Sequence, residues 1–276
     1  MKIFDTRDAL QQYLGTLSTK TVGFVPTMGA LHRGHISLIE QAKAGNDVVV
    51  CSIFVNPTQF NDPADLDKYP RPIEADIAKL EAAGCDILFN PPVTEIYGSN
   101  ENWHLNIGQL EFLLEGEFRP GHYQGVTQVV YKLLDIVKPT NLYMGQKDYQ
   151  QFLVVSRMVQ LLGIPVKMVM CPIEREADGL AMSSRNIHLT ADDRKHSLVL
   201  SQTLNWLKDN FDIHNVFELE QQAMAMLQAE PGVQPEYIEV ADGTTLLPAD
   251  EHSTSIVALT AAKVGKTRLI DNVLIK

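Results

Sequence analysis

Two histidines in a glycine-containing loop are the first residues in the chain whose spacing indicates chemistry. They end the segment Phe24–His35, FVPTMGALHRGH, in which an apolar run leads into a loop and then into a helical pattern. Imidazoles three residues apart at a helix N-terminus can hydrogen-bond phosphate oxygens beside the backbone amides. They can also stabilise the charge that grows on a departing pyrophosphate. The segment therefore predicts a phosphate-binding site at His32 and His35.

Two other interpretations of these histidines stay open on spacing alone. They could be ordinary helix-start residues, or they could chelate a metal, since this spacing suits two ligands. The sequence has no HExxH motif and no third ligand nearby, which weakens the metal interpretation. A P-loop is excluded because His35 and Ile36 stand where that motif requires lysine and a hydroxyl residue. Gly265-Lys266-Thr267, which superficially resembles the end of a P-loop, is expected to form a hairpin turn.

Amide side chains follow the strongest apolar run. Asn56-Pro57-Thr58-Gln59 comes directly after it, and amides at a strand end can bind a small polar substrate without adding charge. Turn formation explains Asn56 equally well. Gln59 has no such explanation, so it is the better candidate for a substrate contact.

A lysine follows another apolar run. Gly145-Gln146-Lys147-Asp148 opens a predicted helix, and Lys147 offers a point charge to phosphate. Asp148 suits a helix cap, a ribose or a metal contact, and capping alone explains it. Gln151 lies one turn further on the same helical face. We expect a ligand at this strand end.

Hydroxyl and guanidinium groups are close together in a later loop. Ser183-Ser184-Arg185 ends the polar segment that starts at Arg175, and such groups on a mobile loop can close over a triphosphate. A solvated linker is the alternative interpretation. Arg119-Pro120-Gly121-His122 is likewise either a turn or a second anion contact.

The elements that position these residues alternate between two patterns over the first 170 or so residues. Apolar runs suited to buried strands alternate with helix-period segments, which is typical of βαβ units and a doubly wound parallel sheet. The expected strands are 22–26, 48–55, 86–89, 141–144 and 166–170, and the expected helices 34–44, 74–83, 126–137 and 148–162. Ligands of such sheets bind beyond the carboxyl ends of strands. The loops after Pro26, Val55 and Met144 are therefore the predicted site.

The pattern changes near residue 173. Helical stretches at 191–210 and 216–228 precede alternating segments at 236–240, 255–261 and 267–275, which predicts a smaller α+β domain. We therefore expect domains at 1–173 and 174–276, the second closing over the active site. The sequence shows no repeat and no low-complexity linker, so close packing of the two is expected.

Composition and charge narrow the class of protein. The 276 residues are 45% hydrophobic and 21% charged, which is ordinary globular usage. A net charge of −11 disfavours nucleic acid and anionic membranes as partners, so an anionic ligand must be held by locally gathered basic groups. Cys51, Cys85 and Cys171 form no CxxC pair, which indicates a reducing compartment. Without an apolar signal core or a membrane-length apolar run, the expected location is the cytoplasm.

Six motifs in order give the chain a close resemblance to the pantothenate synthetase family, the ATP-dependent ligases that join pantoate to β-alanine. The match extends over nearly the whole chain. The motifs are Pro26-Thr27-Met28-Gly29-Ala30-Leu31-His32-x-Gly34-His35, Ser52-Ile53-Phe54-Val55-Asn56-Pro57-x-Gln59-Phe60, Asp65-Leu66-x-x-Tyr69-Pro70-Arg71, Arg119-Pro120-Gly121-His122, Lys147-Asp148-Tyr149-Gln150-Gln151 and Asp178-Gly179-Leu180-Ala181-Met182-Ser183-Ser184-Arg185-Asn186. The family belongs to the HxGH nucleotidyltransferases, whose fold is Rossmann-like and whose shared chemistry is adenylation.

The resemblance implies a role for each matching residue. Catalytic roles fall to His32, His35, Lys147 and Arg185, with His35 the acid as pyrophosphate departs. Pantoate contacts come from Asn56, Gln59, Arg119 and Gln151, and Gln59 also meets β-alanine. The implied ATP contacts are Met28, Gly29, Ala30, Leu31, His32, Arg33, Gly34, His35, Gly145, Gln146, Lys147, Asp148, Glu174 through its backbone, Met182, Ser183, Ser184 and Arg185.

Magnesium and the oligomeric state also come from the resemblance. ATP is the expected second substrate with Mg²⁺ as cofactor, and the family is usually a homodimer. Ala75 and Lys79 stand where relatives often have an acid and glutamine, so Asp76 is the acid that remains for magnesium. Gln146 replaces a common glutamate between glycine and lysine.

The implied reaction is a two-step ligation. The pantoate carboxylate attacks the α-phosphorus of ATP, releasing pyrophosphate, and the β-alanine amine then attacks the acyl carbon of pantoyl adenylate. Positioning and charge stabilisation suffice, because the mixed anhydride is reactive by itself. Three other functions stay open: a nucleotidyltransferase that stops at AMP transfer, a zinc hydrolase built on the two histidines, and a non-enzymatic nucleotide sensor.

Overall fold

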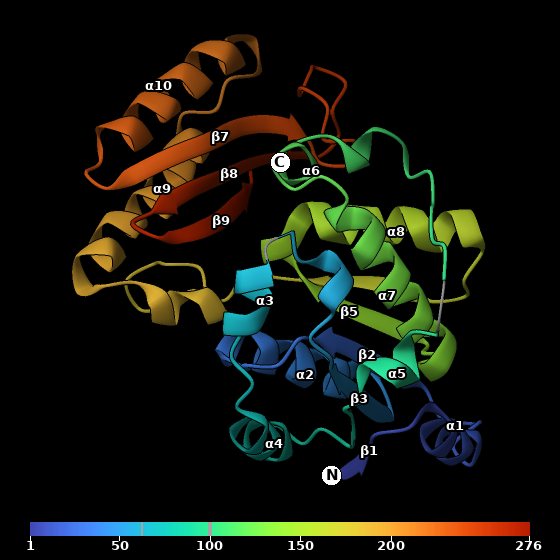
Figure 1. Ribbon diagram of the computed structural model, residues 1–276. Coiled ribbons are helices and arrows are strands. Elements are labelled where there is room, and N and C mark those ends of the chain that lie inside the picture. Colours follow the sequence, from blue (N-terminus) through green and yellow to red (C-terminus); the bar gives the residue numbers. More distant parts are fainter. Residues whose placement is uncertain (62, 99–100) are drawn as a thin grey trace. The chain divides into compact units, whose positions relative to one another are not determined.

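Six parallel strands form the sheet of the N-terminal part of the computed structural model, which describes residues 1–61, 63–98 and 101–276 (Figure 1). The strands are β1 (Lys2–Phe4), β2 (Val22–Thr27), β3 (Val48–Ile53), β4 (Ile87–Phe89), β5 (Asn141–Gly145) and β6 (Lys167–Cys171), in the spatial order β1-β4-β3-β2-β5-β6. The chain runs outward from β2 through β3 to β4 and then crosses to β5 on the other side of β2. The predicted doubly wound sheet is confirmed, and the strand order reverses at the carboxyl ends of β2 and β5.

The helices of this part of the chain follow the predicted alternation. They are α1 (Arg7–Gly15), α2 (Arg33–Gly45), α3 (Pro63–Lys68), α4 (Ile73–Ala82), α5 (Val93–Ile96), α6 (Glu115–Phe118), α7 (His122–Val137) and α8 (Tyr149–Leu162), with short 3₁₀ turns η1 (Pro57–Gln59), η2 (Gly108–Glu111) and η3 (Gln146–Asp148). The predicted helices 34–44, 74–83, 126–137 and 148–162 correspond to α2, α4, α7 and α8. The 126–137 prediction began four residues late, because α7 starts at His122.

Alternate residues of the central strands enter two separate cores. Phe24 and Leu142 pack into a core that includes residues of α7 and α8, whereas the neighbouring Val25 and Tyr143 pack into a core that includes residues of α2 and α4. Successive strand residues point to opposite faces, so a sheet covered on both sides needs continuous apolar runs. This is why the sequence predicted these strands so clearly.

The C-terminal part is a three-stranded antiparallel sheet with two long helices. The strands β7 (Val233–Asp242), β8 (Ile256–Val264) and β9 (Thr267–Leu274) are paired in that order, and their core includes residues of α9 (Ala191–Asp209) and α10 (Val216–Ala229). Two further 3₁₀ turns are η4 (Ser184–His188) and η5 (Ile213–Asn215). The predicted α+β class is confirmed. Gly265, with φ +55°, forms the expected turn between β8 and β9.

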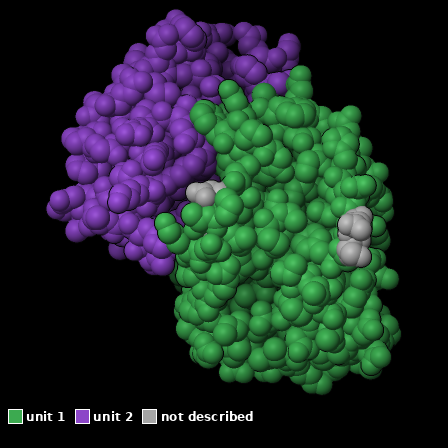
Figure 2. All heavy atoms as spheres, viewed as in Figure 1, with its two compact units in different colours: residues 1–145, 150–172 green, residues 146–149, 173–276 purple. Residues whose placement is uncertain are grey.

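Contacts divide the chain into two units, coloured separately in Figure 2. The first comprises Met1–Gly145 and Gln150–Pro172, and the second Gln146–Tyr149 and Ile173–Lys276. The sequence analysis expected domains at 1–173 and 174–276, and it did not group Gln146–Tyr149 with the C-terminal part. None of the helices in the described ranges is long and apolar enough to span a membrane.

Candidate active site

The loop that leaves β2 is held in an unusual conformation. Gly29 and Ala30 both have positive φ, at +81° and +49°. Thr27 Oγ1 accepts a hydrogen bond from the Gly29 amide at 3.2 Å and donates to the Ser52 carbonyl at 2.7 Å. A Cβ on Gly29 would lie 3.0 Å from Ile53 Cγ2, so packing and backbone both favour glycine here. The loop is a fixed feature of the carboxyl edge of the sheet.

Asp76, a residue of α4, holds this loop through hydrogen bonds. Its side chain is 1% exposed, and its two oxygens accept hydrogen bonds from the amides of Ala30 at 2.7 Å and Leu31 at 2.8 Å. Lys79 Nζ lies 3.8 Å from Asp76 Oδ1 and donates to the Leu31 carbonyl at 2.6 Å. A carboxylate thus satisfies two amides of a strained loop, one of them buried.

The predicted magnesium role of Asp76 does not fit this arrangement. Both oxygens face amide hydrogens, and the nearest charge is the ammonium group of Lys79. In the described ranges no three His, Cys, Asp or Glu side chains group together as metal ligands. The sequence could not show this, because the amides that Asp76 binds lie 45 and 46 residues away.

The two histidines at the start of α2 have a fixed tautomer. His32 Nδ1 accepts a hydrogen bond from the Gly34 amide at 3.2 Å, and His35 Nδ1 accepts one from the His32 amide at 3.3 Å. A backbone amide only donates, so each neutral ring carries its hydrogen on Nε2. The ring centroids are 4.1 Å apart. The start of α2 therefore offers two neighbouring imidazole donors as well as helix amides, a combination suited to phosphate oxygens.

Arg33, between the histidines, is directed along the helix surface. Its guanidinium group binds Glu40 with the nearer pair of atoms 2.6 Å apart, and both side chains are about half exposed. The hydrogen bond from Arg33 lowers the pKa of Glu40.

Asn56 and Gln59 form a hydrogen-bonded pair after β3. Asn56, 1% exposed, accepts through Oδ1 from the Thr58 amide at 3.4 Å and donates through Nδ2 to the Gly125 carbonyl at 3.2 Å. These backbone partners fix which end of the amide is nitrogen. Asn56 Nδ2 also donates to Gln59 Oε1 at 3.2 Å, so Gln59 Nε2 points the other way, 3.3 Å from Met28 Sδ. Gln59 is therefore oriented to offer a donor.

Tyr97, which follows α5, is a third member of this group. Its hydroxyl donates to Asn56 Oδ1 at 2.7 Å and lies 3.2 Å from Thr58 Oγ1. Burial raises its pKa to about 12. Sequence analysis missed Tyr97, although a polar residue shortly after the buried strand β4 is a signal that the same strand-end rule could have used.

Arg119 and His122 hold the backbone of Gln59. His122 Nδ1 lies 2.9 Å from the Gln59 carbonyl and therefore carries the hydrogen, while Nε2 accepts from Arg119 Nη1 at 3.1 Å. Arg119 Nη2 donates to the same carbonyl at 3.4 Å. Gly125 of α7 approaches η1 so closely that a Cβ would lie 2.4 Å from the Thr58 carbonyl oxygen. The Arg119–His122 motif thus supports the η1 loop.

The remaining predicted residues lie at the end of β5 and in the second unit. Gly145 ends β5, and Gln151 is half-buried in the first turn of α8. Lys147 Nζ lies 3.8 Å from Asp148 Oδ1 in η3. The Met182 amide donates to the Glu174 carbonyl at 3.0 Å.

The serine-arginine segment is a folded hairpin and turn. Arg175 and Ala181 form an antiparallel bridge. Ser183 Oγ accepts from the Arg185 amide at 3.2 Å and caps η4, which begins at Ser184. Arg194 of α9 forms ion pairs with Glu176 and Asp178, with N–O distances of 3.0 and 2.7 Å. These contacts give the segment a specific local structure.

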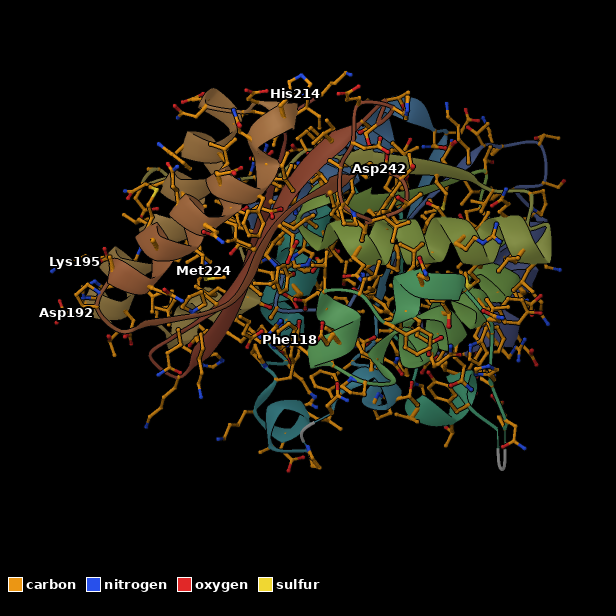
Figure 3. The ribbon with its side chains drawn as sticks, turned by 90° about the horizontal axis from the view of Figure 1, so that it is seen from above. Phe118, Asp192, Lys195, His214, Met224 and Asp242 are labelled. Atoms are coloured by element: carbon orange, nitrogen blue, oxygen red, sulfur yellow. The ribbon has the colours of Figure 1, made fainter. Side chains whose placement is uncertain are left out.

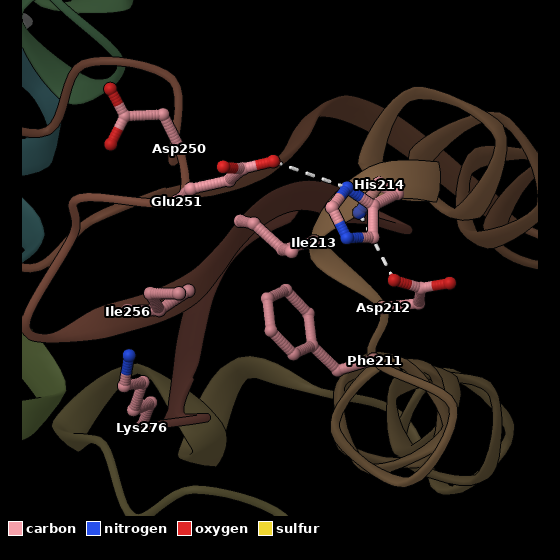
Figure 4. Close-up of a pocket in the computed structure, with 8 residues that line it drawn as sticks. All are labelled: Phe211, Asp212, Ile213, His214, Asp250, Glu251, Ile256 and Lys276. Atoms are coloured by element: carbon pink, nitrogen blue, oxygen red, sulfur yellow. Dashed lines mark hydrogen bonds and ion pairs between the residues drawn. The ribbon is translucent and has the colours of Figure 1, made fainter.

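A hollow in the second unit contains none of the predicted site residues. It has a volume of about 430 Å³ and is lined by Phe211, Asp212, Ile213, His214, Asp250, Glu251, Ile256 and Lys276 (Figure 4). An exposed ion pair between His214 and Glu251, 3.4 Å apart, crosses one side of it.

The fold defines a Rossmann-like α/β protein whose predicted ligand residues include the loops at the carboxyl edge of its parallel sheet. A family model described as pantoate-beta-alanine ligase matches residues 2–274. The chain is 46% identical to a pantothenate synthetase of Phocaeicola vulgatus over 99% of each chain, and 43% identical to that of Thermotoga neapolitana over 100% of each.

Solved structures agree with these sequence matches. The chain matches a pantothenate synthetase structure from Thermus thermophilus with a TM-score of 0.92 and 41% identity, covering 100% of this chain and 99% of that one. It matches a Francisella tularensis pantoate-beta-alanine ligase, complexed with "beta-gamma ATP" and beta-alanine, with a TM-score of 0.83 and 39% identity over 100% and 98% of the chains. The chain belongs to the pantoate–β-alanine ligase family.

Proposed function

We propose that this chain condenses pantoate with β-alanine at the expense of ATP, giving pantothenate, AMP and pyrophosphate through pantoyl adenylate. The family match over residues 2–274 supports the ligase activity. The observation that carries the mechanism is the pair of Nε2 donors that His32 and His35 present at the start of α2.

In the first step a pantoate oxygen attacks the α-phosphorus and the bond to pyrophosphate breaks. Charge then grows on the leaving group. His32 and His35 hydrogen-bond this group through Nε2, with His35 the acid, and the helix N-terminus favours the same charge. On the family resemblance, the loop amides near Gly29, the ammonium group of Lys147 and the guanidinium group of Arg185 are the further phosphate contacts.

Pantoate is held beside this site by amide groups. Gln59 donates through Nε2 to a pantoate oxygen, since its Oε1 is engaged by Asn56. Gln151 and Arg119 are the further pantoate contacts. The two glutamine amides orient the hydroxy acid without adding charge of their own.

In the second step the β-alanine amine attacks the activated acyl carbon and AMP leaves. This needs no covalent enzyme intermediate. Burial raises the pKa of Cys85 and Cys171 to about 11, as expected for inert thiols. Gln59 also contacts β-alanine, and the protein's main task is to orient the amine and exclude water.

Mg²⁺, the cofactor that the family resemblance implies, would offset phosphate charge when bound with ATP, and it would need few ligands from this chain because it keeps several waters. We also propose, on the family resemblance, that the protein is cytoplasmic and that it is a homodimer. Sedimentation of the purified chain tests the oligomeric state.

ATP–pyrophosphate exchange tests the function. We expect exchange only with pantoate present, and AMP release with pantothenate formation once β-alanine is added. AMP transfer that ignores the amine would indicate a nucleotidyltransferase. ATP binding without pyrophosphate release would indicate a sensor. Loss of activity to a chelator that zinc, and not magnesium, restores would indicate a zinc hydrolase.

A further inference from the structure

Two adjacent polar residues are buried in the last strand of the second unit. Asp271 and Asn272 of β9 are 4% and 2% exposed. Buried polar side chains are costly unless they are hydrogen-bonded, so their partners show what they stabilise. Both sets of partners lie in segments predicted to bind ATP.

Asn272 binds the backbone of η3. Its Nδ2 donates to the carbonyls of Gln146 and Lys147, both at 3.0 Å, and its Oδ1 accepts from Gln146 Nε2 at 3.1 Å. Carbonyls only accept, so the orientation of the Asn272 amide is fixed. Both of its donors are used to hold the turn that carries Lys147.

Asp271 binds the base of the serine-arginine segment. Arg175 donates to it from both terminal nitrogens, at 2.7 and 2.9 Å, in the bidentate geometry that aligns a guanidinium group with a carboxylate. Arg175 also donates to the Gly179 carbonyl at 3.1 Å, across the hairpin that it forms with Ala181. Ser183–Arg185 follow directly from this hairpin.

We infer that Asp271 and Asn272 are positioning residues for ATP: one strand fixes the turn bearing Lys147 and the hairpin leading to Ser183–Arg185. This rests on the proposed function for the roles of Lys147 and Arg185. The two side chains touch no reacting atom. They act by setting the backbone from which the phosphate-binding groups project, and a misplacement of about 1 Å is enough to weaken such contacts.

The test measures substrate dependence in Asn272→Ala, Asn272→Asp and Asp271→Asn. Asn272→Asp is nearly isosteric but places an oxygen against the two carbonyls. We expect each Asn272 variant to raise the KM for ATP about tenfold or more, with the KM values for pantoate and β-alanine within about twofold of the parent. Asp271→Asn should raise the KM for ATP by a smaller factor, because one acceptor for Arg175 remains.

Matched controls come from the same unit. Asn210→Ala removes an amide that donates to the Trp206 carbonyl at 2.9 Å, a bond of the same kind away from both segments. Asp192→Asn breaks an exposed ion pair with Lys195, 3.2 Å apart (Figure 3). Both controls should leave every KM unchanged.

A double-mutant cycle separates positioning from general destabilisation. ATP binding is measured by calorimetry in Lys147→Ala with and without Asn272→Ala. If Asn272 acts through Lys147, the second substitution adds little to the first. Fully additive losses, an unchanged KM for ATP, or an equal rise in all three KM values would overturn the inference.

The calorimetric measurement also distinguishes failure of the positioning inference from failure of the proposed function. Calorimetry needs no pantoate, so weakened ATP binding in folded Asn272 variants supports positioning even if the parent shows no pantoate-dependent exchange. If Asn272→Ala does not fold, the nearly isosteric Asn272→Asp keeps the comparison available.

Discussion

Gln59→Glu tests the orientation of the pantoate site most sharply. The substitution is nearly isosteric. One carboxylate oxygen can still accept from Asn56 Nδ2, as Oε1 does at 3.2 Å, so the local fold is retained. The second oxygen replaces Nε2, the atom that lies 3.3 Å from Met28 Sδ. The donor that the proposed function assigns to pantoate becomes a charged acceptor.

Two free-energy contributions set the size of the expected loss in kcat/KM for pantoate. Losing one hydrogen bond to a charged substrate costs about 1.5 to 3 kcal/mol. Placing two negative charges about 4 Å apart near the surface adds up to about 4 kcal/mol. Water relaxation reduces the second term, so we expect about 3 to 5 kcal/mol in all, or roughly 10²- to 10⁴-fold in kcat/KM for pantoate. Gln59→Ala, which removes the donor without adding a charge, should lose about 1.5 to 3 kcal/mol.

The assay is pantoate-dependent ATP–pyrophosphate exchange with each substrate varied in turn. The KM for ATP should stay close to the parent value. Gln160→Glu is the matched control, because Gln160 also accepts through Oε1, from Arg157 at 2.8 Å, on an exposed surface. If Gln59→Glu were as active as the parent, or more active than Gln59→Ala, Gln59 would be acting as an acceptor and the derived orientation would be wrong.

Four further substitutions test the rest of the account. His35→Ala should cost about 2 to 4 kcal/mol of transition-state stabilisation, seen as lower kcat in pyrophosphate exchange, because a preorganised donor is lost. Tyr97→Phe should raise the KM for pantoate by about 2- to 10-fold and leave that for ATP unchanged, since Asn56 keeps its other donors. Asp76→Asn should lower the free energy of unfolding by about 2 to 4 kcal/mol and raise the KM for ATP, because one loop amide then faces an NH₂ group; denaturant unfolding and exchange kinetics measure the two effects. Glu220→Gln should stabilise the protein by about 1 to 2 kcal/mol at pH 8 and leave it unchanged near pH 4.5, measured by denaturant unfolding across this range.

The sign of the Glu220 effect follows from its pKa, which burial raises to about 7 against the opposing hydrogen bond from the Val240 amide. A folded-state pKa above the unfolded value means that the folded protein holds the proton more tightly. The contribution of Glu220 to the free energy of unfolding is therefore greatest below about pH 4.5 and is lost as the pH rises through about 7. Glutamine removes the titration and can still accept from Val240. A steeper pH dependence in the variant would contradict this reasoning.

Three of these variants have a control of the same chemistry. Tyr131→Phe, on the exposed side of α7, accompanies Tyr97→Phe. Glu40→Gln breaks only the exposed pair with Arg33 and accompanies Asp76→Asn. Glu218→Gln, exposed in the same helix as Glu220, should show no pH-dependent gain. Near-normal turnover in His35→Ala would remove that residue from the mechanism.

The architecture was predictable from the amino-acid sequence alone. Continuous apolar runs such as 48–53 favour strands covered on both faces, and polar loops at their carboxyl ends predict a ligand edge. Local pattern was weaker for β1 and α1, which were not predicted: β1 has three residues with none buried, and α1 buries only Leu10.

The hydrogen-bond partners of the polar groups in these loops became apparent only in the folded chain. Asp76, to which the family resemblance gave a magnesium role, holds two loop amides from another element. The donor orientation of Gln59 and the Nε2 tautomers of the histidines likewise depend on where backbone amides and carbonyls lie. A residue's type and spacing limit the chemistry that it can perform. Its hydrogen-bond partners, which come from distant parts of the chain, select one role among those, because a buried donor or acceptor must be satisfied by whatever the fold places beside it.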